Sequence, residues 1–362
     1  MTDEYHTFDR QTDRQTDRQT DRQTDRIFNV DLNRVGWIDV AKGIAIVLVI
    51  IGHTVQFGGG TRNFIFSFHM PLFFLLSGFT YKVAQDWKTF KNHLKKGVRH
   101  LIIPCIIVSC IGIIVQWGMG HNYSGQALWI IVKQMGNALW WASGVGVNSH
   151  PAAGAIWFLF SLFWAKTIID GISLLFPDKN KEYIYMFIGL LGLALGIKHK
   201  WLPQNLDVTF VTVLFIYLGM LWKRYIAAIQ EHENILFLCA VAFWLCCLNF
   251  DVYIEMAGRS YPYLAISIIE AVAGSFAVCC FCKALMANVK LSLPIQFIGM
   301  HTLLIFLIHH MDWTVHALWQ TNTMWKTCTL RIVIVFLVSF VIYIVNRKGE
   351  IYRNRRMKVE RK

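Results

Sequence analysis

The chain has 362 residues, of which 55% are hydrophobic and only 16% are charged, and its mean hydropathy is +0.44. Soluble domains contain about 25% charged residues, so this composition excludes a water-soluble enzyme of this size. The formal net charge of +13 does not indicate nucleic-acid binding, because the basic residues fall in loops between apolar runs, as they do in polytopic membrane proteins.

Residues 9–26 repeat the tetrad Asp-Arg-Gln-Thr. Opposite charges at adjacent positions and no apolar side chain leave nothing to bury, so residues 1–33 are predicted to form a disordered tail to which we assign no role. The rest of the chain is predicted to form a transmembrane domain over residues 34–346 and a basic cytoplasmic tail over residues 347–362. No separate soluble domain is predicted.

From Trp37 onward, apolar segments recur that approach the roughly 20 residues needed to cross the hydrocarbon core. They lie at about 37–57, 64–83, 101–118, 153–176, 183–198, 208–223, 234–250, 262–287, 294–315 and 328–346. With the N-terminus inside, the cytoplasmic loops hold most of the Lys and Arg residues. The sequence therefore predicts an all-α bundle of about ten transmembrane helices with both termini in the cytoplasm, a multi-pass protein of the inner (cytoplasmic) cell membrane.

The nine cysteines show no metal-ligand spacing and no disulfide framework. Eight of them lie within apolar segments, where a reduced cysteine packs as a small apolar residue. We therefore predict no metal site.

The first apolar segment carries Lys42 and His53, eleven residues apart. Eleven steps of ~100° return to nearly the same helix face, and the rise per residue separates the two by about 16 Å. With an inner N-terminus, Lys42 lies toward the cytoplasm and His53 toward the outside. Charged groups this deep are costly unless they are paired or face water, so both are functional candidates. The alternative is structural, with Asp39 pairing with Lys42 one turn away and His53 capping the helix.

Two further histidines are expected at the depth of His53. His69 lies in the outer third of the second segment, which a short connection makes a neighbour of the first, and His309 lies near the outer end of the ninth. Histidines from adjacent helices at one depth could form a base and its orienting partner. Taken alone, His69 could equally be a core histidine with a satisfied hydrogen bond.

The basic run before the third segment contains Lys96 and Arg99 and ends at Pro104. Its default explanation is a solvated cytoplasmic loop. The functional alternative is a dock for the phosphates of a nucleotide cofactor, because Lys and Arg pair well with phosphate. Trp157 opens the fourth segment at the outer interface, where aromatic residues also serve as anchors. Glu270, mid-membrane in the eighth segment, must be protonated, paired or facing water.

Together these motifs resemble the acyltransferase 3 family of membrane O-acyltransferases, which includes bacterial acetylases of fucose and surface polysaccharides. The resemblance covers about residues 34–346, with the motifs in the family's order. They are Lys42 with His53, His69-Met-Pro71 through Ser77-Gly78-Phe79, the basic run ending at Pro104, Trp157-Phe158-Leu159, and Gly299-Met-His301-Thr302-Leu303 through His309. In the last motif His301 and Thr302 stand where the family has Asn and Ser.

The resemblance implies transfer of an acetyl or similar acyl group from a cytoplasmic acyl-CoA, usually acetyl-CoA, to a hydroxyl. The implied acceptor is a glycan or lipid-linked sugar, and no nucleic acid takes part. An imidazole that titrates near neutrality suits removal of the hydroxyl proton. We expect His53 to be that base, assisted by His69. Lys42 would contact the donor, with Lys96 and Arg99 near its phosphates; Asp39, Trp157 and His309 complete the expected binding residues.

Two other functions stay open at this point. A secondary transporter or glycan flippase would also place charged residues at mid-membrane, although it usually shows an internal repeat of broken helices that this sequence lacks. A membrane scaffold without catalytic activity would explain the apolar segments but not the three residues Lys42, His53 and His69 together.

Overall fold

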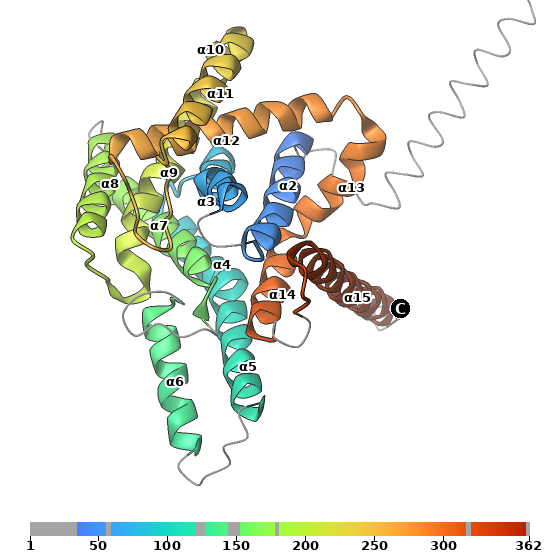
Figure 1. The fold of residues 1–362 in the computed structure, drawn as a ribbon. Coiled ribbons are helices and arrows are strands. Elements are labelled where there is room, and N and C mark those ends of the chain that lie inside the picture. The colour runs from blue at the N-terminus through green and yellow to red at the C-terminus, as the bar shows by residue number, and fades with distance from the viewer. Residues whose placement is uncertain are drawn as a thin grey trace, which may run out of the picture.

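The computed structural model describes residues 35–55, 59–119, 127–143, 153–177, 181–315 and 320–359, and the N-terminal tail predicted at residues 1–33 lies outside these ranges. Regular structure in the described ranges is helical (Figure 1), apart from one bridge between Glu255 and Ser260. The helices are α2 (Gly36–Gly52), α3 (Gly60–Thr80), α4 (Trp87–Gly97), α5 (Ile103–Met119), α6 (Ala127–Trp141), α7 (Trp157–Leu175), α8 (Lys181–Ile197), α9 (Leu206–Arg224), α10 (Ile226–Glu231), α11 (Glu233–Asn249), α12 (Ala265–Leu285), α13 (Val289–Met300), α14 (Thr302–Val315) and α15 (Met324–Val359).

The described helices include six that are long and apolar enough to cross a membrane, namely α3, the continuous α4–α5, α7, α9, α12 and α15. The pair α13–α14, bent by 69° at a break beside His301, makes a seventh if it counts as one span. The apolar segments that form α2, α8 and α11 give helices of 17 residues each, at the short end of what crosses a bilayer. The protein is thus an all-helical, multi-pass membrane protein.

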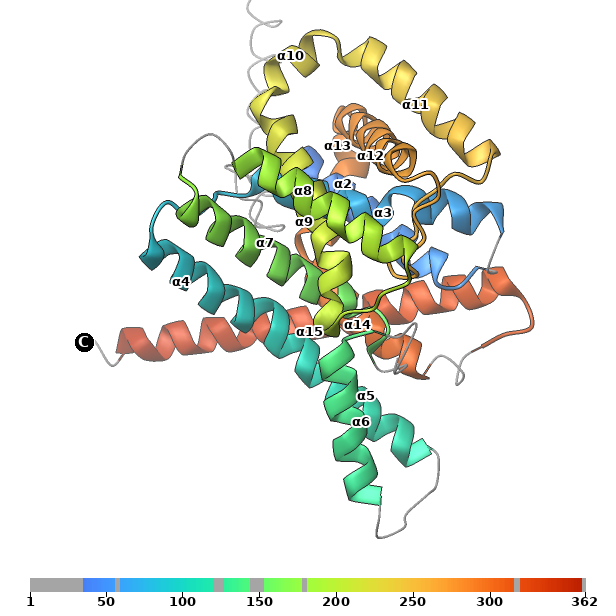
Figure 2. The ribbon, with the colours of Figure 1, turned by 90° about the vertical axis from the view of Figure 1, so that its left-hand side faces the viewer.

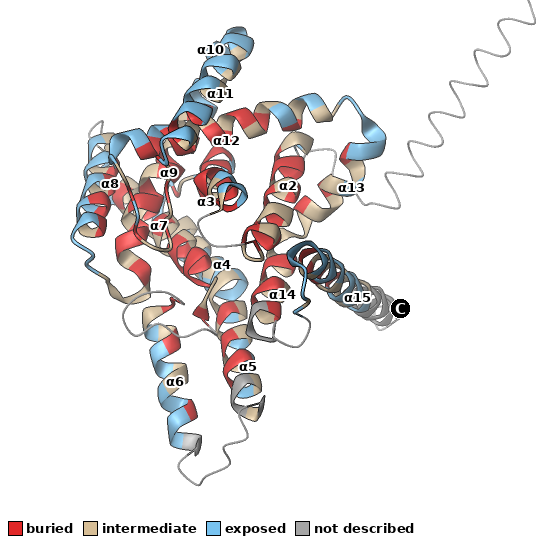
Figure 3. Ribbon diagram, in the orientation of Figure 1, coloured by how far each residue is buried: buried red, intermediate tan, exposed pale blue. Residues whose placement is uncertain are grey.

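Close packing of the central helices depends on glycines. Gly78 of α3 lies against the backbone carbonyl of Ile216 in α9, where a Cβ would overlap with the carbonyl oxygen. Gly299 of α13 lies in the same way against the carbonyl of Asp39 in α2. Glycine lets helix backbones approach this closely in a membrane protein. Figure 3 shows the result: α3 and α9 are largely buried, whereas α10 and α11 expose most of their surface.

The helices α4 and α5 form one long helix interrupted by a π-helical turn at Val98–Ile102. Asp86 begins α4 by accepting a hydrogen bond from the backbone N of Thr89 at 2.8 Å, and the hydrogen bonds from Thr89 lower the pKa of this carboxyl. α5 then pairs with α6 in a hairpin that projects from the rest of the molecule (Figure 2). The basic residues of α4 therefore lie beside α7, away from that hairpin.

Candidate active site

Three histidines from three parts of the chain meet at the end of α2. The ring centroids of His53 and His309 lie 5.4 Å apart. Phe66 links the third histidine to them, because its ring lies 5.5 Å from that of His53 and 4.6 Å from that of His69. His69 and His309 are 2% and 1% exposed. The structure therefore brings together the histidines that the sequence placed at one depth.

His53 and His69 line a cavity of about 30 Å³, the histidine cavity, which also has Trp157 and Glu255 in its wall. Such a volume has room for about one or two water-sized groups. His69 Nδ1 lies 2.8 Å from the carbonyl oxygen of Ile65. A carbonyl can only accept, so Nδ1 carries the hydrogen and the neutral ring keeps Nε2 as an acceptor. The ring of His69 is thus fixed in one tautomer beside His53.

A second cavity of about 240 Å³, the lysine cavity, adjoins the histidine cavity. Its two basic residues are Lys42 of α2 and Lys166 of α7, and the other residues in its wall are apolar or carry hydroxyl groups. The two cavities share the residues Val49, Met70 and Phe306. Lys42 and His53 therefore line two adjoining cavities.

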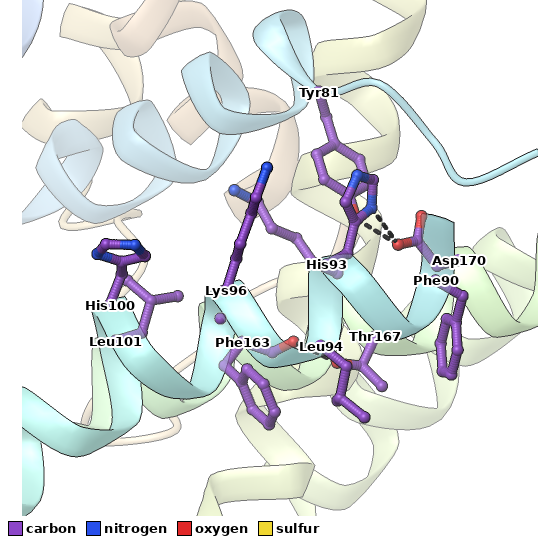
Figure 4. A pocket seen from close by; sticks show the side chains of 12 residues that line it. Tyr81, Phe90, His93, Leu94, Lys96, His100, Leu101, Phe163, Thr167 and Asp170 are labelled. Carbon is purple, nitrogen blue, oxygen red and sulfur yellow. Dashed lines mark hydrogen bonds and ion pairs between the residues drawn. The ribbon is translucent and has the colours of Figure 1, made fainter. Parts of the chain in front are cut away.

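A third cavity of about 250 Å³ lies between α4 and α7 (Figure 4), and we call it the α4–α7 cavity. Asp170, 1% exposed, accepts hydrogen bonds from the Tyr81 hydroxyl at 2.7 Å and from His93 Nδ1 at 2.8 Å. It also accepts one from the backbone N of Ala84 at 2.9 Å. Burial and the Asp170 carboxylate raise the pKa of Tyr81, so the tyrosine stays protonated and donates. Asp170 thereby fixes α4 and its connection to α3, and with them Lys96 in the cavity wall.

The three cavities follow one another through the bundle. The α4–α7 cavity and the lysine cavity share Leu101 and Lys166, and the lysine cavity in turn adjoins the histidine cavity. Lys166 thus lies at the junction between the two larger cavities, and its Nζ lies 5.1 Å from the centroid of the Tyr81 ring. The series connects the exposed basic helix α4 with the buried histidines.

Three predicted site residues, Asp39, Arg99 and His309, lie outside the walls of the three cavities. Arg99 is exposed in the π-helical turn and is not part of any of the three walls, whereas Lys96 three residues earlier is. The neighbouring residues Gly97, His100 and Leu101 line the α4–α7 cavity. Asp39 is 4% exposed and contacts Gly299 through its backbone.

The structure adds charged residues that the sequence reasoning missed. Lys166 and Asp170 lie on α7, and Asp312 and Arg331 lie on α14 and α15 beside the histidines. Each is a charged side chain within an apolar segment, which is the signal that identified Lys42. The same test applied to the fourth, ninth and tenth segments would have found all four.

Within the described ranges, no group of three or more His, Cys, Asp or Glu side chains is arranged to hold a metal ion. A family model described as an acyltransferase domain matches residues 35–346. The nodulation protein NolL of Mesorhizobium japonicum is 38% identical over 78 residues, which is 19% of this chain and 21% of that protein. The chain therefore spans about a fifth of the length of this relative. No solved structure matches the chain.

Proposed function

The chain belongs to the acyltransferase 3 family of membrane acyltransferases, and on this premise we propose that it transfers an acetyl group from cytoplasmic acetyl-CoA to a hydroxyl of a sugar or cell-surface glycan precursor. The observation that carries the proposal is the series of three cavities from basic α4 to the buried histidines. Acetyl-CoA has charged phosphates at one end and a reactive thioester at the other. A path with cations at one end and histidines at the other matches both.

The donor binds with its phosphates at the α4–α7 cavity. Lys96 and Lys166 line that cavity, and charge-assisted hydrogen bonds from such cations to phosphate are among the strongest that proteins make. Arg99, exposed in the neighbouring turn, adds positive charge near the entrance. The uncharged arm of the donor continues through the lysine cavity past Lys42, toward the histidine cavity.

The reaction takes place beside His53. The acceptor hydroxyl oxygen attacks the thioester carbonyl carbon while His53 removes the hydroxyl proton. The tetrahedral intermediate then collapses, the C–S bond breaks, and CoA leaves as a thiolate that takes up a proton, so the products are an O-acetyl ester and CoA. His69 supports His53 from the other wall of the same cavity, and His309 lies against the ring of His53. Trp157 and Glu255 also line this cavity and are expected to contact the acceptor.

The proposal includes the membrane arrangement and the domain limits. We propose ten spans with both termini in the cytoplasm of the inner membrane, the 17-residue helices α2, α8 and α11 completing the set. The exposed lysines of α4 then lie on the cytoplasmic side, in agreement with the positive-inside rule. Residues 34–346 form the acyltransferase domain, and residues 1–33 and 347–362 flank it.

The test uses inverted membrane vesicles, which expose the cytoplasmic face, from cells with and without the protein. Radiolabelled acetyl-CoA is supplied, and base-labile label is measured in the glycan and lipid-linked sugar fractions. We expect label that depends on the protein and is lost in His53→Ala. His232→Ala, an exposed histidine between α10 and α11, is the matched control and should retain it.

Two outcomes would overturn the proposal. One is the absence of label with the wild-type chain, and the other is full labelling by His53→Ala at an equal amount of protein. Transport of a glycan across the membrane with no new ester would instead identify a flippase or secondary transporter.

A further inference from the structure

Two charged residues of the last helices lie beside the histidines without lining the histidine cavity. Arg331 of α15 and Asp312 of α14 are 2% and 4% exposed. Arg331 Nε donates to Asp312 Oδ2 at 2.8 Å, and a second guanidinium nitrogen lies 2.7 Å from the same oxygen. The two side chains thus form a buried, forked ion pair between α14 and α15.

The third guanidinium nitrogen of Arg331 reaches the end of α2. It donates to the backbone carbonyl of His53 at 3.2 Å and to the Thr54 hydroxyl at 2.9 Å. One planar guanidinium therefore joins α15, α14 and the two residues that follow α2. Arginine has donors on several edges of a rigid plane, and lysine cannot reproduce that geometry.

Asp312 extends the network to His309, one helical turn earlier on α14. Its Oδ2 lies 3.7 Å from His309 Nδ1, which is an ion-pair distance when that imidazole is protonated, and the His309 ring in turn lies 5.4 Å from the ring of His53. Arg331 consequently acts on the histidine pair from both sides, holding the backbone of His53 directly and the ring of His309 through Asp312.

Stability alone is a weak reason for such a pair. Replacing a buried ion pair by apolar residues of similar volume is often neutral or stabilising, because removing two charges from water is costly. A fixed geometry gives a stronger reason, because a displacement of about 1 Å in a reacting group can cost a factor of about 100 in rate.

We propose that Arg331 and Asp312 are positioning residues that hold His53 and His309 in the arrangement needed for proton removal, which makes α15 part of the active centre. The inference rests on the proposed acyl transfer. It assigns the two residues no contact with the donor or the acceptor. Their loss is therefore expected to lower kcat and leave the KM for acetyl-CoA nearly unchanged.

The test is the double variant Asp312→Leu/Arg331→Met, which removes both charges and leaves neither one buried alone. Initial rates of label transfer from radiolabelled acetyl-CoA are measured in the vesicles described above, with thermal unfolding of the detergent-solubilised protein as the measure of folding. We expect kcat to fall about 10- to 100-fold, with the KM for acetyl-CoA within about twofold and the unfolding midpoint close to that of the wild type. Arg331→Lys keeps the charge but not the planar guanidinium, and its kcat should lie between those of the wild type and the double variant.

The matched control is Glu233→Leu/Lys283→Met, which removes the ion pair joining α11 and α12, where neither residue lines the three cavities. It should leave kcat unchanged. Wild-type kcat in Asp312→Leu/Arg331→Met, or equal losses of kcat in both double variants, would overturn the positioning role while the proposed function stands. If the wild-type chain itself transfers no label, the proposed function fails, and this inference fails with it.

Discussion

The two ends of the cavity series are built in opposite ways. The α4–α7 cavity is about 250 Å³ in volume, and Lys96 in its wall is exposed to solvent. The histidine cavity is about 30 Å³, and His69 in its wall is 2% exposed. A roomy, charged cavity binds through attraction that falls off gradually with distance, whereas a small, enclosed one depends on the positions of a few atoms. Changes in the histidine cavity should therefore affect kcat, and changes in the α4–α7 cavity should affect the KM for acetyl-CoA.

The largest effect that tests this contrast is expected for His69→Ala. A positioned acid or base contributes about 100- to 10,000-fold, so loss of the partner of His53 should lower kcat by about 100-fold or more. The control is His301→Ala. His301 Nδ1 bonds the Phe297 carbonyl at 2.7 Å, the same kind of bond that His69 makes to Ile65, yet His301 lines none of the three cavities. Equal losses of kcat in both variants would mean that His69 only stabilises its own helix.

Lys166→Met changes the wall of the α4–α7 cavity and is expected to alter the KM for acetyl-CoA, not kcat. Lys166 lines both larger cavities, and a hydrogen bond to a charged group contributes about 1.5–3 kcal/mol, so the KM for acetyl-CoA should rise about tenfold or more. The rate at saturating donor should change little. Lys200→Met, at an exposed position after α8, is the control; a fall in kcat without a rise in KM would contradict a donor-binding role.

The sequence predicted the residues around the histidine cavity better than those around the α4–α7 cavity, and the reason is physical. The angle of ~100° per residue placed Lys42 and His53 on one face, and loop charge placed His69 and His309 at the same depth. These are properties of single helices and of their order. Lys166 and Lys42 line the same cavity only because α7 packs against α3, where the rings of Phe158 and Phe74 lie 5.0 Å apart. No periodicity within one segment reports which helices pack together.

Two local departures from regular helices were equally absent from the sequence pattern. A π-helical turn at Val98–Ile102 interrupts the long helix between α4 and α5 and contains Arg99. The 69° bend beside His301 divides the predicted ninth segment into α13 and α14. The apolar pattern continues through both places, so hydropathy marks the segments correctly and gives no sign of either break.

Volume offers a second comparison of the two ends. Ala257 lines the histidine cavity, and Ala257→Leu would place three additional carbon atoms in about 30 Å³. The added atoms occupy space that the acceptor hydroxyl needs, so we expect transfer to fall roughly tenfold, and overpacking should also lower the free energy of unfolding by about 1–3 kcal/mol. Thr167→Phe in the α4–α7 cavity adds four side-chain heavy atoms and is the comparison, and it should reduce transfer less than about threefold because about 250 Å³ accommodates the larger side chain. Similar losses in the two variants would show that both ends fit their ligand equally tightly.

The smallest effect is expected for Lys96→Ala, and salt distinguishes it from Lys166→Met. Lys96 is exposed, and exposed ion pairs contribute about 0.2–1 kcal/mol, so the KM for acetyl-CoA should rise only about two- to fivefold at low ionic strength. The Debye length shrinks from about 10 Å at 0.1 M salt to about 3 Å at 1 M, so this difference from the wild type should nearly vanish at high salt. Lys166 is partly buried at the junction of two cavities, where salt screens less, so the rise in KM caused by Lys166→Met should persist. Donor titrations of both variants at the two salt concentrations would settle whether charge acts at the entrance by general attraction and deeper in the path by direct contact; parallel salt dependence would place both lysines in the same solvated entrance.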